Sequence, residues 1–167
     1  MRVLGVDPGT YNMGIGVVDT SEGAQKFVHS QVVNAKRNQS ISTRLHFLFE
    51  SLKECIDVWN PDSVAIESPF VGKNMRSALA IGQAQAIALL AAAGRGLSVR
   101  TYSPREVKQS VTGYGDSSKE QVRDMVWAVL DINDITNSLD ASDAIAIALC
   151  HANSLDVDQL LAENDRQ

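Results

Sequence analysis

Apolar positions follow two different periods along this chain, and each change of period marks a change of secondary structure. Residues 2–7 are almost wholly apolar, which is typical of a central strand buried on both faces. Residues 13–19 and 26–33 are predicted to form two further strands, separated from the first and from each other by short turn sequences. Connections this short favour an antiparallel meander of three strands.

Helices and short strands alternate after the meander. Apolar residues recur at helical spacing between residues 41 and 59, and Pro61 ends that helix. Ser103 and Pro104 form a start signal for a short helix, and Ser117 with Glu120 has the spacing of a capping box. The other elements that we expect after residue 60 are strands at 63–67 and 97–102, and helices at 75–93, 119–130 and 140–152.

This order predicts an α/β fold with a five-stranded mixed sheet flanked by helices on both faces. The length of 167 residues and a hydrophobic content of 44% suit a single domain with a substantial core. We place that domain at residues 1–154 and expect 155–167 to be a short, acidic, frayed tail. In sheets of this kind, functional sites form where adjacent central strands end.

Charge is unevenly distributed. The net charge of −5 argues against a nucleic-acid partner. However, residues 73–123 carry eight basic and three acidic side chains, whereas residues 124–167 carry nine acidic side chains and one basic. The middle of the chain can therefore be locally basic, although ordinary solvated surface explains the charges equally simply.

Targeting and redox signals are weak. The N-terminal residues lack the pattern of a signal peptide, and the longest apolar stretch, 86–94, is too short to cross a bilayer. We therefore expect a soluble cytoplasmic protein with no membrane partner. Cys55 and Cys150 lie in apolar helical contexts without a CxxC motif, which favours buried free thiols over a disulfide.

Four carboxylates stand where the predicted elements can bring them together. Asp7 ends the first strand and Glu67 ends the fourth, while Asp140 and Asp143 are three residues apart on one helix face. Unpaired carboxylates in one crevice repel each other, so they take up protons or bind a hard cation such as Mg²⁺ or Mn²⁺. Two such ions about 4 Å apart suit phosphodiester hydrolysis. Taken singly, these residues also fit a turn, an N-cap and a helix dipole.

Four ordered blocks give the sequence a family resemblance that covers nearly the whole of residues 2–153. The blocks are GVDPGTYNMGIGV, AIESPFVGKNMRSALAIGQAQAI, PREVKQSVTGYGDSSKEQV and DASDAIAIALCH. Together they resemble the RuvC family of Holliday junction resolvases, which implies a ribonuclease H-like fold. The resemblance also implies a metal-dependent crossover junction endodeoxyribonuclease.

The resemblance implies roles for particular residues. The family's metal site, with Mg²⁺ (or Mn²⁺ in its place) and two ions per active site, falls on Asp7, Glu67, Asp140 and Asp143. The family's junction-facing aromatic falls on Phe70, which is placed to stack on an unpaired base, although a hydrophobic loop anchor is the alternative. The implied phosphate-binding residues are Lys108 and Lys119, which also act in catalysis, and the further candidates Lys73, Arg76 and Arg105.

The implied activity is symmetric, paired nicking of four-way DNA junctions during recombination and repair, leaving 5′-phosphate and 3′-hydroxyl ends. Two cuts of like polarity require a homodimer, and the small-residue helix at 78–93 is a candidate interface, with core packing as the alternative. A branch-migration motor is an implied partner. Two features depart from the family: the acidic end LLAENDRQ replaces a basic tail, and some members have His at the position of Asp140.

Three other functions remain open from the sequence. The first is a ribonuclease H-like enzyme acting on RNA, and the second is a non-catalytic junction-binding protein. Four intact carboxylates argue against a pure binder, because negative charge near phosphates weakens binding. The third is an actin-like ATPase, which normally needs two such domains, whereas this length holds only one.

Overall fold

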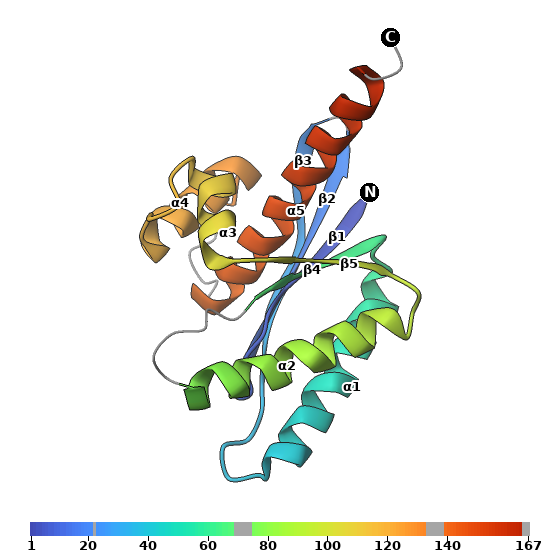
Figure 1. Ribbon diagram of the computed structural model, residues 1–167, viewed down its shortest axis with the longest axis vertical. Helices are drawn as coiled ribbons and strands as arrows, with labels where there is room; N and C mark the ends of the chain where they lie inside the picture. Colours follow the sequence, from blue (N-terminus) through green and yellow to red (C-terminus); the bar gives the residue numbers. More distant parts are fainter. Residues whose placement is uncertain (22, 69–74, 133–138, 165–167) are drawn as a thin grey trace.

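The structure is a computed structural model that describes residues 1–21, 23–68, 75–132 and 139–164. One five-stranded sheet, in the order β3-β2-β1-β4-β5, forms the centre of the molecule (Figure 1). The strands are β1 (Arg2–Asp7), β2 (Asn12–Ser21), β3 (Ala24–Asn34), β4 (Ser63–Glu67) and β5 (Ser98–Tyr102).

The pairing of the strands confirms both the meander and the mixed sheet. β1 pairs antiparallel with β2, and β2 pairs antiparallel with β3. On the other side, β1 pairs parallel with β4, and β4 pairs parallel with β5. In the parallel register Val6 is the partner of Ile66, so the residues that follow them, Asp7 and Glu67, end neighbouring strands side by side.

Helices cover the two faces of the sheet in two groups (Figure 1). Leu4 and Val6 of β1 point into a core shared with α1 and α2, whereas Val3 belongs to a second core shared with α3, α4 and α5. This burial on both faces explains the unbroken apolar run of β1. The helices are α1 (Ile41–Trp59), α2 (Met75–Ala93), α3 (Pro104–Thr112), α4 (Lys119–Leu130) and α5 (Leu139–Asn164).

Helix α5 packs against β1 and β2 at unusually close range. A Cβ atom at Gly5 would lie 2.2 Å from the carbonyl oxygen of Ala144, and one at Gly16 would lie 2.6 Å from the amide nitrogen of Ile145. Only glycine leaves room for the helix backbone at these two positions. This close packing places the N-terminal part of α5, including Asp143, beside the end of the sheet that carries Asp7.

Two sequence-based boundaries were wrong. The N-cap of α4 is Ser118, in a capping box with Gln121, and the expected box of Ser117 and Glu120 does not form. The reason is that the buried Ser117 hydroxyl bonds within the preceding turn, where it donates to the Tyr114 carbonyl oxygen at 2.8 Å. The shift is one residue, because both serines have a suitable partner three positions later.

The last helix also differs from expectation. Instead of ending near residue 152, α5 continues through Asn164, so the backbone after residue 154 is helical rather than frayed. No glycine or proline interrupts residues 144–164, and several leucines and alanines there favour helix. The domain boundary at residue 154 stays a prediction.

Helix α2 is apolar on two sides. It is the one helix among the described residues with the length and hydropathy of a membrane span, a property that core helices share. Ala84, Ala88 and Ala91 are buried against the sheet and α1, while Leu79 and Leu90 are each more than 60% exposed. Core packing therefore explains one side of the helix, whereas the other side has no packing partner among the described residues.

Candidate active site

Neighbouring parallel strands bring two carboxylates to one edge of the sheet. Asp7 is the last residue of β1 and Glu67 the last of β4, and both border a pocket of about 290 Å³. Helices α3, α4 and α5 close the pocket over the sheet. The residues that line it are Asp7, Glu67, Pro104, Val107, Lys108, Lys119, Val122, Asp143 and Ala146.

A third carboxylate enters the pocket from α5 and is paired with a lysine. The Lys119 ammonium donates to Asp143 Oδ2 at 2.5 Å. Lys119 is the first residue of α4, and the Ser118 cap fixes where that helix begins. This bond raises the pKa of Lys119 above its usual value, so the lysine stays charged at neutral pH.

Glu67 experiences the excess of negative charge. Burial raises the pKa of its carboxyl, and the charges of Asp7 and Asp143 raise it further, to about 7. Lys119 and Lys108 act in the opposite direction without cancelling the effect. The other four ionisable residues of the pocket therefore all lie close enough to act on the Glu67 carboxyl.

The donor set of the pocket suits a hard divalent cation. Carboxylate oxygens are the ligands that Mg²⁺ and Mn²⁺ prefer, and the described lining contains neither cysteine nor histidine. The raised pKa of Glu67 marks the surplus negative charge that such a cation neutralises. Among the described side chains, no three potential ligands stand close enough to enclose an ion as they are placed.

The turn between the two lysines is held by hydroxyl groups. The Thr112 hydroxyl lies 2.8 Å from the Lys108 carbonyl oxygen and 2.7 Å from the Ser117 hydroxyl. It also accepts from the Tyr114 amide at 3.2 Å. These bonds fix the end of α3 relative to the start of α4, and hence Lys108 relative to Lys119. Thr112 was not among the residues predicted from the sequence, where its only signal is a hydroxyl residue on either side of the glycine-containing turn.

The predicted site residues divide into three groups. Asp7, Glu67, Asp143, Lys108 and Lys119 all line the pocket. Two other predicted residues lie outside the pocket. For the remaining three, either the whole residue or its side chain lies outside the described residues.

Arg105, also on α3, does not line the pocket. Its side chain crosses the backbone at Gly115, where a Cβ atom would lie 2.8 Å from Arg105 Cγ. Arg76 is an exposed residue in the first turn of α2 and does not line the pocket. Phe70 and Lys73 lie outside the described residues, as does the side chain of Asp140, whose backbone belongs to the first turn of α5.

The family follows from comparison with known proteins. A family model described as crossover junction endodeoxyribonuclease RuvC matches residues 3–151. The chain belongs to the RuvC family. A RuvC endonuclease of Dehalococcoides mccartyi is 45% identical over 151 residues, which cover 90% of this chain and 92% of the relative. Another, of Geobacter metallireducens, is 40% identical and covers 96% of this chain and 98% of its own.

A solved structure supports the same assignment. RuvC of T. thermophilus in complex with a Holliday junction substrate superposes with a TM-score of 0.86 at 31% identity. The match covers 93% of this chain and 94% of that one. It confirms the ribonuclease H-like fold, with the five-stranded mixed sheet flanked by helices. Membership of the RuvC family of nucleases also implies dependence on a divalent metal ion.

Proposed function

We propose that this chain is an endonuclease that resolves four-way DNA junctions by symmetric paired nicks, leaving 5′-phosphate and 3′-hydroxyl ends. One observation carries the proposal. Three carboxylates and two lysines meet in one pocket, in a chain that belongs to the RuvC family along nearly its whole length. A pure junction binder has no use for three carboxylates in one pocket, because negative charge near the DNA repels phosphates.

The metal of this site is, in our proposal, Mg²⁺, with Mn²⁺ able to replace it and two ions bound per site. Asp7, Glu67 and Asp143 would hold the ions, with Asp140 as the fourth predicted ligand. The bound metal would lower the pKa of the attacking water and stabilise the leaving oxygen. The side chains of the pocket prepare the site for this chemistry because their oxygens are hard ligands with surplus charge.

The two lysines would orient the DNA. Lys119 is already hydrogen-bonded to Asp143, so its ammonium can share its remaining protons with a phosphate oxygen beside that carboxylate. Lys108 lines the same pocket from α3 and adds a second positive charge. The buried Val107, Val122 and Ala146 form the apolar wall of the pocket behind them.

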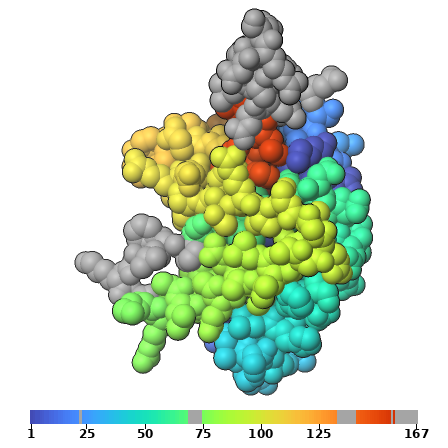
Figure 2. All heavy atoms as spheres, turned by 45° about the vertical axis from the view of Figure 1, so that its right-hand side comes forward, coloured from blue at the N-terminus to red at the C-terminus, as the bar shows by residue number. Residues whose placement is uncertain are grey.

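A homodimer would supply the two active sites that symmetric nicking needs. The exposed side of α2 carries Met75, Leu79 and Leu90 at helical spacing, with exposures of 82%, 67% and 64%. Gly82 lies on the same stripe with no atom within 4 Å of a Cβ built there, so another helix can approach closely. Figure 2 shows α2, in green to yellow-green, along the surface of the molecule. We place the dimer interface there.

By the same reasoning from the family, the enzyme would act in the cytoplasm alongside a branch-migration motor. Phe70 would stack on an unpaired base at the crossover, and Lys73, Arg76 and Arg105 would contact phosphates. These roles are part of the proposal.

Cleavage of a synthetic immobile four-way junction tests the proposal. The junction and a matched linear duplex are incubated with Mg²⁺, with EDTA, and with the Asp7→Asn variant. We expect paired nicks at symmetric positions in the junction alone, lost with EDTA and in the variant. Tight junction binding without nicking would instead indicate a structural binder, and cleavage of an RNA substrate alone would indicate a different enzyme.

A further inference from the structure

A positively charged surface lies beside the active site, on the side away from Lys108 and Lys119. Residues 23–49 contain four basic side chains and no acidic one. Two of the four, Lys36 and Arg37, are exposed in the connection between β3 and α1. Among the described residues, neither forms an ion pair with a carboxylate.

Strand register places this connection at the same edge of the sheet as the active site. Asp7 is paired with Gly14 of β2, and Asn12 of β2 is paired with Asn34, the last residue of β3. The chain between β3 and α1 therefore leaves the sheet at the end where β1 finishes (Figure 1). Neighbouring strands lie about 4.8 Å apart, so the end of β3 is on the order of 10 Å across the sheet from β1.

Hydrogen bonds join this connection to the turn that follows Asp7. The Ala35 amide donates to the Tyr11 carbonyl oxygen at 2.7 Å. The buried Arg44 of α1 donates through Nε to the Thr10 carbonyl oxygen at 3.1 Å and through Nη1 to the Gln39 carbonyl oxygen at 2.7 Å. One guanidinium thus fixes both segments, and the positive surface has a set position relative to Asp7.

Tyr11 lies where these two segments meet, and its ring contacts two arginines. Tyr11 is 41% exposed. The Arg44 guanidinium carbon lies 4.2 Å from the centroid of its ring, and that of Arg37 lies at 5.5 Å. Both distances lie within the range of cation–π contacts. Stacking restrains the long Arg37 side chain while its guanidinium edge keeps its hydrogen-bond donors for a ligand.

We infer that Lys36 and Arg37, with Tyr11 holding the arginine, bind backbone phosphates of a duplex DNA arm on the β2–β3 side of the active site. Phosphates of one strand repeat about every 3.4 Å along the duplex axis. Lys36 lies two strands across from Asp7 and four residues beyond Val32, so its offset is on the order of 10–20 Å and corresponds to a few nucleotides. Lys108 and Lys119 hold the strand on the other side of Asp7. The inference rests on the proposed function and adds a positioning surface to it.

Salt dependence of junction binding tests the inference. The double variant Lys36→Gln/Arg37→Gln is made in the Asp7→Asn background, so that binding is measured without cleavage. Lys26→Gln is the matched control, because Lys26 is an exposed lysine of the same acid-free segment near the opposite end of β3. Tyr11→Phe keeps the ring, whereas Tyr11→Ala removes it.

Each lost phosphate contact lowers the steepness of log K against log salt by about 0.9, so we expect a decrease of roughly 1.8 for the double variant. Tyr11→Ala is expected to weaken binding in the same direction, while Lys26→Gln and Tyr11→Phe leave both affinity and slope unchanged. A double variant with the slope of Lys26→Gln would overturn the inference. If the Asp7→Asn protein itself binds junction no better than duplex, the proposed function fails instead, so the two failures are distinguishable.

Discussion

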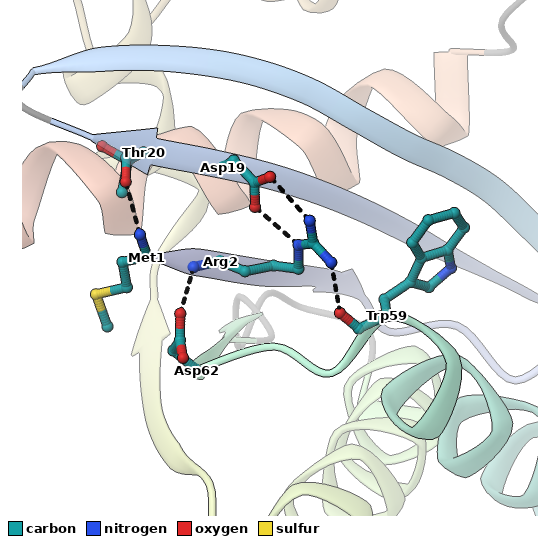
Figure 3. A network of polar contacts seen from close by, with 6 residues as sticks. All are labelled: Met1, Arg2, Asp19, Thr20, Trp59 and Asp62. Carbon is teal, nitrogen blue, oxygen red and sulfur yellow. Dashed lines mark hydrogen bonds and ion pairs between the residues drawn. The ribbon is translucent and has the colours of Figure 1, made fainter.

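Charged side chains are arranged in opposite ways at the two ends of β1. At its start, the Arg2 guanidinium donates to both oxygens of Asp19, at 2.8 and 2.9 Å, and to the Trp59 carbonyl oxygen at 2.9 Å (Figure 3). The Arg2 amide donates to Asp62. These bonds lower the pKa of the Asp19 carboxyl, mainly through the hydrogen bond from Arg2. The side-chain charges of Arg2 and Asp19 are therefore paired with each other.

At the end of β1, five residues onward, like charges gather instead. Asp7, Glu67 and Asp143 share one pocket, and the pKa of Glu67 rises to about 7. Lys119 is hydrogen-bonded to Asp143 but leaves a net surplus of negative charge around Glu67. The start of the strand therefore stabilises the fold, whereas its end carries an electrostatic cost that protonation or a cationic ligand relieves. Such costs concentrate at functional sites.

The largest expected contrast is in catalysis. Asp7→Asn should lower the junction nicking rate by at least about 1,000-fold, because loss of a metal ligand removes several kcal/mol of transition-state stabilisation. Asp19→Asn changes the same residue type near the other end of β1 and should leave the rate unchanged. Single-turnover nicking with saturating enzyme measures both. Equal losses in the two variants would mean that the two ends do not differ in function.

The second contrast is in the dependence of stability on pH without metal. The pKa of Glu67 is raised in the folded state from 4.5 to about 7, so its contribution to stability is full below about 4.5 and is lost as the pH rises through 7. We expect the wild-type protein in EDTA to lose up to about 3 kcal/mol of unfolding free energy from this group between pH 4.5 and 8. Glu67→Gln should abolish that decline in urea denaturation curves.

Asp19 is expected to change the stability of the protein with pH in the opposite direction. Its pKa is lowered in the folded state, so its contribution is present above its unfolded pKa and is lost as the pH falls through the folded value. Asp19→Asn should therefore reduce stability at neutral pH and change little at strongly acidic pH. For Glu67, the electrostatic account of the pocket is refuted if the unfolding free energies of wild type and Glu67→Gln change with pH in parallel.

A smaller effect is expected from the turn between the lysines. Thr112→Val keeps the shape of the side chain but removes the hydroxyl that joins Lys108 to Ser117. Misplacement of Lys119 should slow nicking by roughly tenfold while junction affinity stays unchanged. Thr112→Ser retains the hydroxyl and should restore the rate. Rate constants and dissociation constants measured separately distinguish this positioning role from a loss of folding.

The smallest effect is expected at the start of β1. Arg2→Gln breaks a partly exposed ion pair, whose side chains are 34% and 38% exposed, so we expect a loss of only about 1 kcal/mol in unfolding free energy. The nicking rate of the folded enzyme should not change. Thermal denaturation measures the first quantity, and an altered nicking rate would show that the two ends of the strand are coupled.

Local patterns in the sequence were sufficient to predict most of the architecture. The apolar run of residues 3–6 predicted a strand buried on both faces. The Ser103 capping signal was confirmed as a capping box with Glu106. Such signals depend on neighbours within a few residues, which the sequence contains in full. The same locality explains the error at Ser117 and Ser118: both serines satisfy the capping rule, and only the fold buries one of them.

The candidate site divides in the same way. The sequence by itself determined that Asp7 and Glu67 end strands, because a charged residue closing an apolar run is visible in one dimension. Only the tertiary structure decided that β1 and β4 are neighbours, that Gly5 lets α5 bring Asp143 to them, and that Lys119 pairs with Asp143. These contacts join residues far apart in the chain, and their energies depend on distance and burial, which exist only once the elements have packed.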